Sequence, residues 1–483
     1  MTTQTIAIVG GGVGGLTAAI RLATAGHDVA IYERNDVVGG KLARFERDGY
    51  SFDLGPSLLT LPRVFDEVFQ LAGTSLANEL DLVRLDPQFR YHWRDGSKLV
   101  VHDDNDATAA EFEAFAGAGD AWRKFDERGK KIWDVSERTF FAGPMTNPLA
   151  MAKRMESLQD LTAIDGLRTL DGAARAAFPD RHLRQWARRY ATYSGSSPFK
   201  APATLTCVPH IEAAHGCWYP MGGLDALRAA LARVAEGVGV HIRTSTEVTE
   251  VQADASSVTG LRLTGGERVA ADVIIANVDA LHLYEDLLDD EGEAKKVRRA
   301  PRSTSGFVLC LGVTGTTEGI GHHNVWFSDQ STQEFLQLDA GQLADDPTIY
   351  GCVSSVTDPS QAPAGNENWY LLVNTPPGAE INAPQYRDLV LERLAAHGVD
   401  LRDRMQFCAR MTPADIEDLS GSSGGAIYGT SSNGKRAAFN RPSNRGARQG
   451  LYLVGGSSHP GGGLPLVATS ASIVAQMIAD DLS

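Results

Sequence analysis

The chain has 483 residues, of which 43% are hydrophobic and 22% are charged, a composition that excludes disordered and fibrous proteins. Its length favours two domains over one compact core. The formal net charge of −15 argues against a nucleic-acid partner, which would require clustered positive charge.

The first predicted element is an apolar strand, residues 5–9, which a glycine turn joins to a helix over residues 16–26. The turn matches GxGxxG: the first glycine permits a tight turn, the second lets a pyrophosphate approach the backbone, and the third allows close helix packing. The helix N-terminus then faces the phosphates. The predicted cofactor-binding residues of this turn are Gly10, Gly12, Val13, Gly14 and Gly15. A Rossmann-like turn without a ligand is the alternative.

The next predicted strand, residues 27–32, ends in Glu33. A carboxylate at this distance from the glycine turn binds ribose hydroxyls and disfavours the 2′-phosphate of NADP. A second glycine turn, followed by FDLGPS at residues 52–57, lets the chain pass the far side of the pyrophosphate, which favours FAD over NAD. The predicted residues of this second set are Arg34, Gly39, Gly40, Lys41, Gly55, Pro56 and Ser57. An unrelated loop is the alternative for this segment.

The GxGxxG turn, the second glycine pair and FDLGP together resemble the fingerprint of the amine oxidase and phytoene desaturase flavoprotein superfamily. The resemblance implies an α/β fold, in which a Rossmann-like FAD-binding domain is interleaved with an α+β substrate domain. We expect the FAD-binding domain to comprise residues 1–84, 217–281 and 436–483, and the substrate-binding domain residues 85–216 and 282–435. Residues 41–44 (KLAR) depart from the pattern of the family and leave the details of flavin placement open.

Two segments predict contacts with apolar material. Residues 89–101 form a hairpin pattern with Phe89, Tyr91 and Trp93 on one face, which favours core packing and has an apolar tunnel as its alternative. Further on, residues 139–158 place apolar side chains beside Lys153 and Arg154; these are Leu149, Met151, Met155 and Leu158. Core packing is the preferred interpretation, and an amphipathic surface that dips into a bilayer is the alternative.

No apolar run reaches the roughly 18 residues that a membrane-spanning helix needs. The N-terminal residues also lack the basic stretch of a secretory signal. We therefore expect a cytoplasmic protein whose membrane contact, through its substrate-binding domain, is peripheral and at the inner face of the membrane.

The middle of the chain predicts a helix over residues 225–239, a strand over residues 240–243, and a strand and hairpin that end at Ala276. In the resembled superfamily this unit belongs to the FAD domain. The resemblance adds two predicted cofactor-binding residues: Val248, whose backbone lies near adenine, and Asn277, at the end of the last strand. Residues 307–311 and 325–327 predict buried strands.

The C-terminal end repeats the strand-loop-helix pattern, with a strand at residues 451–454 and a helix over residues 466–482. The helix N-terminus would stabilise negative charge on the reduced flavin. The predicted cofactor-binding residues are Gly455, Gly456, Gly463, Leu464 and Pro465, and the apolar helix face comprises Val467, Ala471, Val474 and Ile478. His459 is a candidate catalytic acid-base residue; the preferred interpretation is that it orients the glycine loop or lines the flavin pocket.

Several internal segments resemble bacterial carotenoid desaturases of the phytoene desaturase family: residues 189–198 (RYATYSGSSP), 322–329 (HHNVWFSD) and 346–363. With TPADIED from Thr412 and GGAIYG from Gly424, the nearest branch resembles the hydroxycarotenoid 3,4-desaturases of the methoxyneurosporene dehydrogenase type. The likeness covers nearly the whole chain. It implies an FAD-dependent enzyme that desaturates a hydrophobic polyene, a carotenoid or related polyprenoid, by hydride transfer from a C–H bond to flavin N5.

Such a reaction needs a dry tunnel that aligns the C–H bond more than it needs a strong base. The sequence offers no convincing catalytic triad, and its five cysteines contain no CxxC pair, so we expect neither a metal nor a disulfide framework. Three alternatives stay open. They are a flavin amine oxidase, a carotene isomerase, and a non-catalytic prenyl-binding protein, since Rab escort and GDP-dissociation-inhibitor proteins resemble the same fold.

Overall fold

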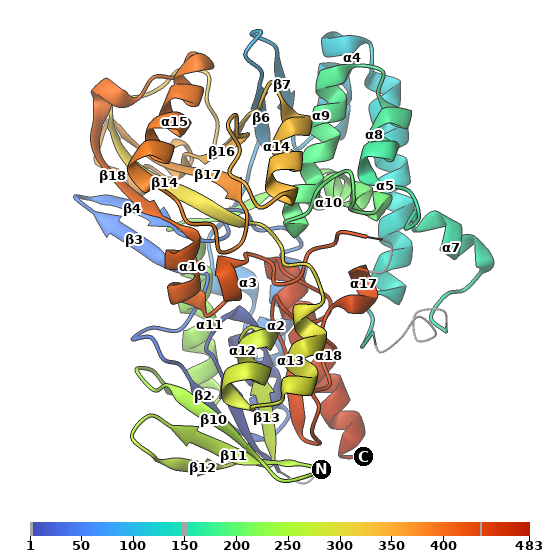
Figure 1. The fold of residues 1–483 in the computed structure, drawn as a ribbon, viewed down its shortest axis with the longest axis vertical. Coiled ribbons are helices and arrows are strands. Elements are labelled where there is room, and N and C mark those ends of the chain that lie inside the picture. The colour runs from blue at the N-terminus through green and yellow to red at the C-terminus, as the bar shows by residue number, and fades with distance from the viewer. Residues whose placement is uncertain (1–2, 146–152, 435–436) are drawn as a thin grey trace.

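The structure, a computed structural model, describes residues 3–145, 153–434 and 437–483. Two sheets organise it: a parallel sheet lies at one end of the long axis, near both termini, and a larger, mostly antiparallel sheet lies at the other (Figure 1). The predicted fold class, an α/β Rossmann-like part with an interleaved α+β part, is confirmed.

The parallel sheet has five strands in the order β19-β13-β1-β2-β9. Their bounds are β1 (Thr5–Val9), β2 (Asp28–Tyr32), β9 (His241–Arg243), β13 (Val273–Ala276) and β19 (Leu451–Leu453). The central strand is β1, where Ile8 pairs with Ile31 on one side and Ile275 on the other. Strands from the two ends and the middle of the chain thus form one sheet. Its strands β1, β13 and β19 consist almost entirely of buried apolar residues, as expected for strands that are covered on both faces.

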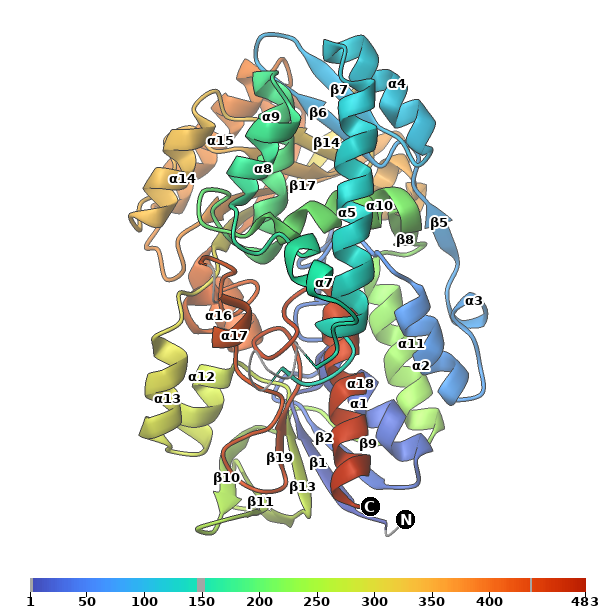
Figure 2. The same cartoon turned by 90° about the vertical axis from the view of Figure 1, so that its right-hand side faces the viewer.

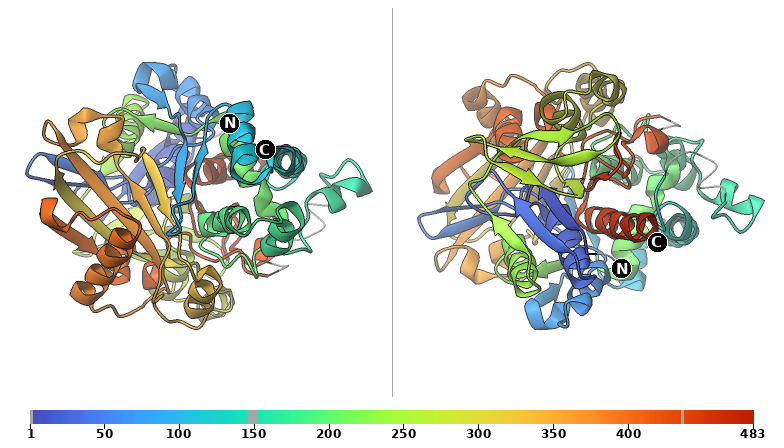
Figure 3. Two further views of the ribbon diagram at one scale, coloured as in Figure 1. Left: turned by 90° about the horizontal axis from the view of Figure 1, so that it is seen from above. Right: turned by 90° about the horizontal axis from the view of Figure 1, so that it is seen from below.

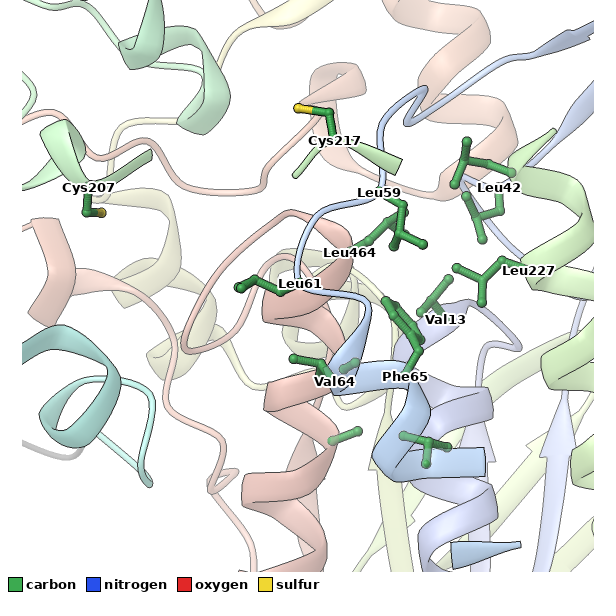
Figure 4. Packing of buried hydrophobic residues seen from close by; sticks show 14 of the residues in the cluster. Val13, Leu42, Leu59, Leu61, Val64, Phe65, Cys207, Cys217, Leu227 and Leu464 are labelled. Carbon is green, nitrogen blue, oxygen red and sulfur yellow. The ribbon is translucent and has the colours of Figure 1, made fainter. Parts of the chain in front are cut away.

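Helices cover one face of this sheet; they are α1 (Val13–Thr24), α2 (Arg63–Leu71), α11 (Leu224–Gly237) and α18 (Leu464–Asp481). Figure 4 shows side chains such as Val13, Phe65 and Leu227 gathered in their shared core. The helix α1 begins three residues before the predicted start, because the glycines of the turn continue into helical backbone. In α18, Ala471, Val474 and Ile478 are buried as predicted, whereas Val467 is only half-buried and faces a cavity.

The opposite face carries a three-stranded antiparallel sheet, β10 (Val248–Ala253), β11 (Val258–Leu263) and β12 (Arg268–Ala270) (Figure 3, right). It shares a hydrophobic cluster with Ala7 and Val9 of β1, whose neighbours Ile6 and Ile8 point to the helical side. This alternation follows from the two-residue period of a strand. Two short helices, α12 (Ala280–His282) and α13 (Glu291–Arg298), pack beside it.

The second large sheet has seven strands in the order β18-β14-β17-β16-β15-β6-β7. Their bounds are β6 (Phe89–His92), β7 (Lys98–Val101), β14 (Ser305–Thr314), β15 (His323–Trp326), β16 (Ile349–Cys352), β17 (Asn366–Thr375) and β18 (Met405–Met411). All neighbours are antiparallel except β15 and β6, which are parallel. The predicted hairpin at residues 89–101 and both predicted buried strands are confirmed.

Helices surround this second sheet. On one side lie α14 (Ser331–Asp339), α15 (Ala383–Ala396) and α16 (Pro413–Ser420). Beside β6 and β7 stands a group that contains α4 (Asn105–Ala116), α5 (Gly119–Thr139), α8 (Leu170–Ala177), α9 (Arg181–Arg189) and α10 (Cys207–His215). The longest of these, α5, runs toward α18 and so approaches the C-terminal glycine loop (Figure 2).

Two small two-stranded sheets join the halves. One, β3 (Arg44–Arg47) with β4 (Tyr50–Asp53), packs on the second large sheet, where the rings of Tyr50 and Phe407 lie 5.4 Å apart. A second two-stranded antiparallel sheet, which is not a hairpin because its strands are far apart in the chain, pairs β5 (Leu82–Arg84) with β8 (Trp218–Pro220). Three further short α-helices are α3 (Leu76–Glu79), α7 (Leu158–Ala163) and α17 (Ala437–Asn440).

The segment predicted to pack in the core or dip into a bilayer is only partly described. Leu149 and Met151 lie outside the described residues, and Met155 lies in a stretch of turns and bends that precedes α7. No helix in the described ranges combines the length and the apolar character needed to cross a bilayer.

Candidate functional site

The two glycine turns of the N-terminal part and the C-terminal glycine loop meet. The backbone N–H of Gly39 donates to the carbonyl oxygen of Gly11 at 2.8 Å, and Gly12 forms a parallel bridge with Gly39. On the other side, a Cβ on Gly14 would lie 3.2 Å from the Cα of Gly455. Three segments far apart in the sequence therefore surround one space, as the strand-turn-helix pattern predicted.

Glycine is required at the first and third positions of the GxGxxG turn. Gly10 has φ +94°, and a Cβ there would lie 2.9 Å from the carbonyl oxygen of Asn277. A Cβ on Gly15 would lie 2.3 Å from the carbonyl oxygen of Gly10, so the helix can approach the turn only without a side chain. The side chain of Asn277 adds a hydrogen bond, since its Nδ2 donates to the same oxygen of Gly10 at 3.1 Å.

Glu33 is buried at the edge of this space. Its Oε2 accepts from the backbone N–H of Gly11 at 2.8 Å, and its Oε1 accepts from the N–H of Asn35 at 2.9 Å. The carboxylate is therefore held beside the glycine turn, on the side where β2 ends. This is the position that a ribose-binding acid requires.

Basic side chains tie the glycine turns to the rest of the chain. Lys41 Nζ donates to the carbonyl oxygens of Ala426 (3.1 Å) and Ile427 (2.8 Å), and burial lowers the pKa of Lys41 to about 8. Arg441, which the sequence analysis did not identify, donates to the carbonyl oxygen of Gly456 at 2.8 Å, and burial lowers its pKa to about 10. The loop at Gly456 and the turn after Gly40 are thus fixed by long cationic side chains.

A cavity of about 470 Å³ runs from the glycine turns to the seven-stranded sheet. Most predicted cofactor-binding residues line it. They are Gly10, Gly12, Val13, Gly14, Glu33, Arg34, Gly39, Gly40, Lys41, Gly55, Pro56, Ser57, Val248, Asn277, Gly455, Gly456, Gly463, Leu464 and Pro465. Gly15 is not among the lining residues, in keeping with its predicted packing role.

His459 lies beside the glycine loop but does not line the cavity. It is buried, its Nε2 donates to the carbonyl oxygen of Phe140 at 2.9 Å, and the two rings lie 4.7 Å apart. Burial lowers the pKa of His459 to about 4. The side chain therefore connects the C-terminal loop to the end of α5, and its acid-base role stays a prediction.

The part of the cavity next to the seven-stranded sheet is lined mainly by residues with side chains larger than that of glycine. Many of these residues are apolar and belong to the second sheet and the segments around it, among them Phe89, Val308, Val325, Phe327, Leu372 and Met411. Where the two parts meet, the hydroxyl of Tyr350 lies 2.6 Å from Ser57 Oγ and 2.8 Å from His323 Nδ1. Of the predicted aromatic face, Phe89 reaches the cavity, whereas Tyr91 and Trp93 are buried in the core.

Glu334 and Arg189 are among the ionisable residues of the cavity wall that no sequence motif indicates. Glu334 is buried and accepts from the backbone N–H and the hydroxyl of Thr348 at 2.8 and 2.7 Å, and burial raises its pKa to about 7. Arg189, the last residue of α9, is surrounded by aromatic rings. Neither has a recognisable local motif, and the only signal for Arg189 was its place in the RYATYSGSSP segment.

Potential metal ligands converge at one buried place in the described residues. His322, His323 and Cys352 each bring a candidate ligand atom to within 4.8 Å of the others. Strand pairing explains this, because His323 of β15 is the register partner of Cys352 of β16. The trio could not be predicted from the sequence, since its members do not follow a metal-ligand spacing along the chain.

The residues around the glycine turns fit a dinucleotide. Glycines from three segments leave the space that side chains would fill, and the N-termini of α1 and α18 border the cavity at Val13 and Leu464. Helix N-termini and backbone N–H groups stabilise phosphates and other anions. With Glu33 beside the first turn, the residues present can hold FAD.

Comparisons with known proteins agree. The family described as flavin containing amine oxidoreductase matches residues 13–478. A 4,4′-diapolycopene oxygenase of Methylomonas sp is 35% identical over 490 residues, with 99% of each chain covered. A 4,4′-diaponeurosporene oxygenase of Staphylococcus haemolyticus is 34% identical over 492 residues, covering 99% of this chain and 97% of its own.

Solved structures share the fold at low identity. A putrescine oxidase bound to putrescine aligns with a TM-score of 0.67 at 15% identity, covering 100% of this chain and 99% of its own. A fatty acid isomerase of P. acnes that produces CLA aligns with a TM-score of 0.64 at 15% identity, covering 99% of each chain. Together with the family match and the full-length relatives, these findings show that the chain belongs to the flavin-containing amine oxidoreductases and is an FAD-dependent oxidoreductase.

Proposed function

We propose that this chain oxidises a carotenoid or related polyprenoid by removing hydrogen from it, as a carotenoid desaturase does. The observation that carries this proposal is the cavity, which continues from the glycine turns into a part lined by apolar side chains such as Val308, Leu372 and Met411. A long apolar chain would fill that part and leave its end beside the cofactor. The names of the full-length relatives, which are oxygenases of diapolycopene and diaponeurosporene, support a polyene substrate.

The reaction that we propose converts neighbouring C–H bonds to C=C, with loss of one hydride and one proton. FAD, when bound, supplies the acceptor for the hydride. The apolar lining excludes water and fixes which C–H bond lies at the reacting position. Conjugation along the polyene spreads the developing positive charge, so no strongly basic side chain has to contact the reacting carbon.

Within this proposal, the site residues and the domain division keep the assignments made from the sequence. Residues 1–84, 217–281 and 436–483 bind the cofactor, and residues 85–216 and 282–435 bind the substrate. The strand content of the two large sheets supports this division. The particular reaction that we propose is that of a hydroxycarotenoid 3,4-desaturase. Oxygenation at the end of the polyene is the second candidate, and it is favoured by the names of the two full-length relatives, which are oxygenases.

Anaerobic mixing of the purified holoprotein with a carotenoid tests the proposal. We expect the flavin absorbance to bleach, and the product to be lighter by two hydrogens. A product that gains oxygen only under air supports the second candidate, and an unchanged mass indicates isomerisation. Bleaching by putrescine or another amine, without any bleaching by carotenoids, contradicts both candidates.

We also propose a peripheral contact with the inner face of the membrane, close to the segment identified in the sequence. Its support is that Leu161 and Leu167, which follow that segment, are large apolar residues with 53% and 79% of their surface exposed. Flotation with phospholipid vesicles tests this contact. If the wild type floats no better than a Leu161→Ser, Leu167→Ser double variant, the contact is elsewhere or absent.

A further inference from the structure

An arginine side chain is buried in the wall of the cavity. Arg189 ends α9, lines the cavity and is only 9% exposed. Its guanidinium carbon lies 4.7–6.0 Å from the centroids of five aromatic rings. These rings belong to Phe89, Tyr91, Tyr190, Tyr193 and Tyr350. The last turn of a helix and the faces of aromatic rings both stabilise a cation, so the charge is held in place.

The hydrogen-bonding capacity of Arg189 is mostly unused. Its Nη1 donates to the hydroxyls of Tyr91 and Tyr193 at 3.3 and 3.4 Å, both long contacts. Within the described ranges, Nε and Nη2 have no acceptor in the protein. A guanidinium carries five N–H donors, and leaving such donors unpaired in an apolar cavity is unfavourable. The site therefore fits a ligand that brings an acceptor.

A buried carboxyl group is linked to Arg189 through a tyrosine hydroxyl. Glu212 is buried on α10 and accepts from the hydroxyl of Tyr190 at 2.9 Å and from that of Tyr193. Tyr193 thus hydrogen-bonds both Arg189 and Glu212. Because a second carboxylate would be an uncompensated buried charge, the missing acceptor is best uncharged.

We propose that Arg189 binds a hydroxyl or carbonyl oxygen at the end of the polyene, and that this chain therefore prefers oxygen-bearing carotenoids to hydrocarbon ones. The inference rests on the proposed function and assigns a residue to substrate choice within it. The position suits this role because Tyr350 lies between the arginine and the cofactor end of the cavity. Its ring centroid lies 6.0 Å from the guanidinium carbon of Arg189, and its hydroxyl oxygen lies 2.6 Å from Oγ of the predicted cofactor-binding residue Ser57. The oxygen-bearing end thus lies where the two parts of the cavity meet.

Titration of the holoprotein with a matched set of polyenes tests this inference. The probes are 4,4′-diapolycopene, its terminal aldehyde and its terminal carboxylic acid, each in detergent micelles, with the shift of the polyene absorption band as the measure of binding. We expect the aldehyde to bind the wild type about tenfold more tightly than the hydrocarbon, the gain of one hydrogen bond to a charged donor. The carboxylic acid should bind no better than the hydrocarbon.

Variants then assign the preference to the guanidinium. In Arg189→Met, the aldehyde and the hydrocarbon should bind within about twofold of each other, with FAD content unchanged. Since this variant leaves Glu212 without its counter-charge, an Arg189→Met, Glu212→Gln double variant, which removes both charges, provides a second measurement. The matched control is Arg184→Met. Arg184 lies on the same helix, but its side chain does not line the cavity, so this variant should keep the preference of the wild type.

Three outcomes overturn the inference: equal binding of aldehyde and hydrocarbon by the wild type, an undiminished preference in both Arg189 variants, or loss of FAD from these variants, which would assign the arginine to the cofactor. A wild type that binds none of the polyenes contradicts the proposed function itself, and so separates the two failures.

Discussion

The two ends of the cavity are built from different parts of the polypeptide. Around the parallel sheet the walls are mainly backbone, with glycines from three segments and two helix N-termini. Around the seven-stranded sheet the walls are mainly side chains, in which apolar residues such as Val308 and Leu372 stand beside polar ones such as Arg189 and Glu334. A cofactor of fixed shape is recognised by main-chain groups that glycines hold in place, whereas substrate choice depends on side chains that can change without disturbing the fold.

This difference predicts how each end responds to substitution. At the backbone-built end, one added methyl group should remove the cofactor and weaken the fold together. At the end built from side chains, one polar substitution should weaken substrate binding and leave the cofactor in place.

The largest effect is expected for Gly15→Ala. The new Cβ would lie 2.3 Å from the carbonyl oxygen of Gly10, a contact with backbone that cannot rotate away. We expect the free energy of unfolding to fall by about 3 kcal/mol and the affinity for FAD to fall by about 100-fold, as measured by denaturant unfolding and by FAD titration of the deflavinated protein.

The matched control is Gly237→Ala, at the end of α11, where a Cβ would meet nothing within 4 Å. It should bind FAD as the wild type does. If Gly15→Ala retains wild-type FAD affinity, the glycine turn does not hold the cofactor.

The same contrast explains what the sequence could predict. The strand-turn-helix units at Gly10 and Gly455 were predictable because their signals are local: an apolar run, glycines at set spacing and an amphipathic helix. The contact between Tyr50 and Phe407, and the reach of Lys41 to Ile427, were not, since each joins residues that only the tertiary fold brings together. Arg189 was missed for the same reason: its aromatic neighbours come from three separate segments.

An intermediate effect is expected for Leu372→Gln at the apolar end. Leu372 is a half-buried residue of β17 in the cavity wall, and an amide there would have to give up water when a polyene enters. We expect carotenoid binding to weaken about tenfold, because burying an unpaired amide is unfavourable, and FAD content to stay unchanged.

Titration of the holoprotein with 4,4′-diapolycopene in detergent micelles, followed by the shift of the polyene absorption band, measures this effect. Leu336→Gln is the control, since Leu336 on α14 is 53% exposed and outside the cavity wall. Loss of FAD from Leu372→Gln, in place of weaker polyene binding, would show that the two ends are not separable.

The smallest effect on catalysis is expected for His459→Gln, which tests the junction between the two ends. The amide can still donate to the carbonyl oxygen of Phe140, so turnover should stay within about threefold of the wild type if His459 only supports the loop.

Burial holds the pKa of His459 near 4 instead of 6.5, so between these two pH values the unfolded chain binds a proton that the native chain does not bind. The native state is therefore destabilised as the pH falls from 6.5 toward 4. The His459→Gln variant should therefore lose less stability than the wild type when the pH falls across this interval, with a difference on the order of 2 kcal/mol in the free energy of unfolding. Urea unfolding at each pH measures this difference. The control is His241→Gln, which replaces an exposed histidine and should follow the wild type. Turnover abolished with FAD content intact would instead make His459 a participant in the chemistry, and would mean that a side chain outside the cavity wall reaches the substrate in the working enzyme.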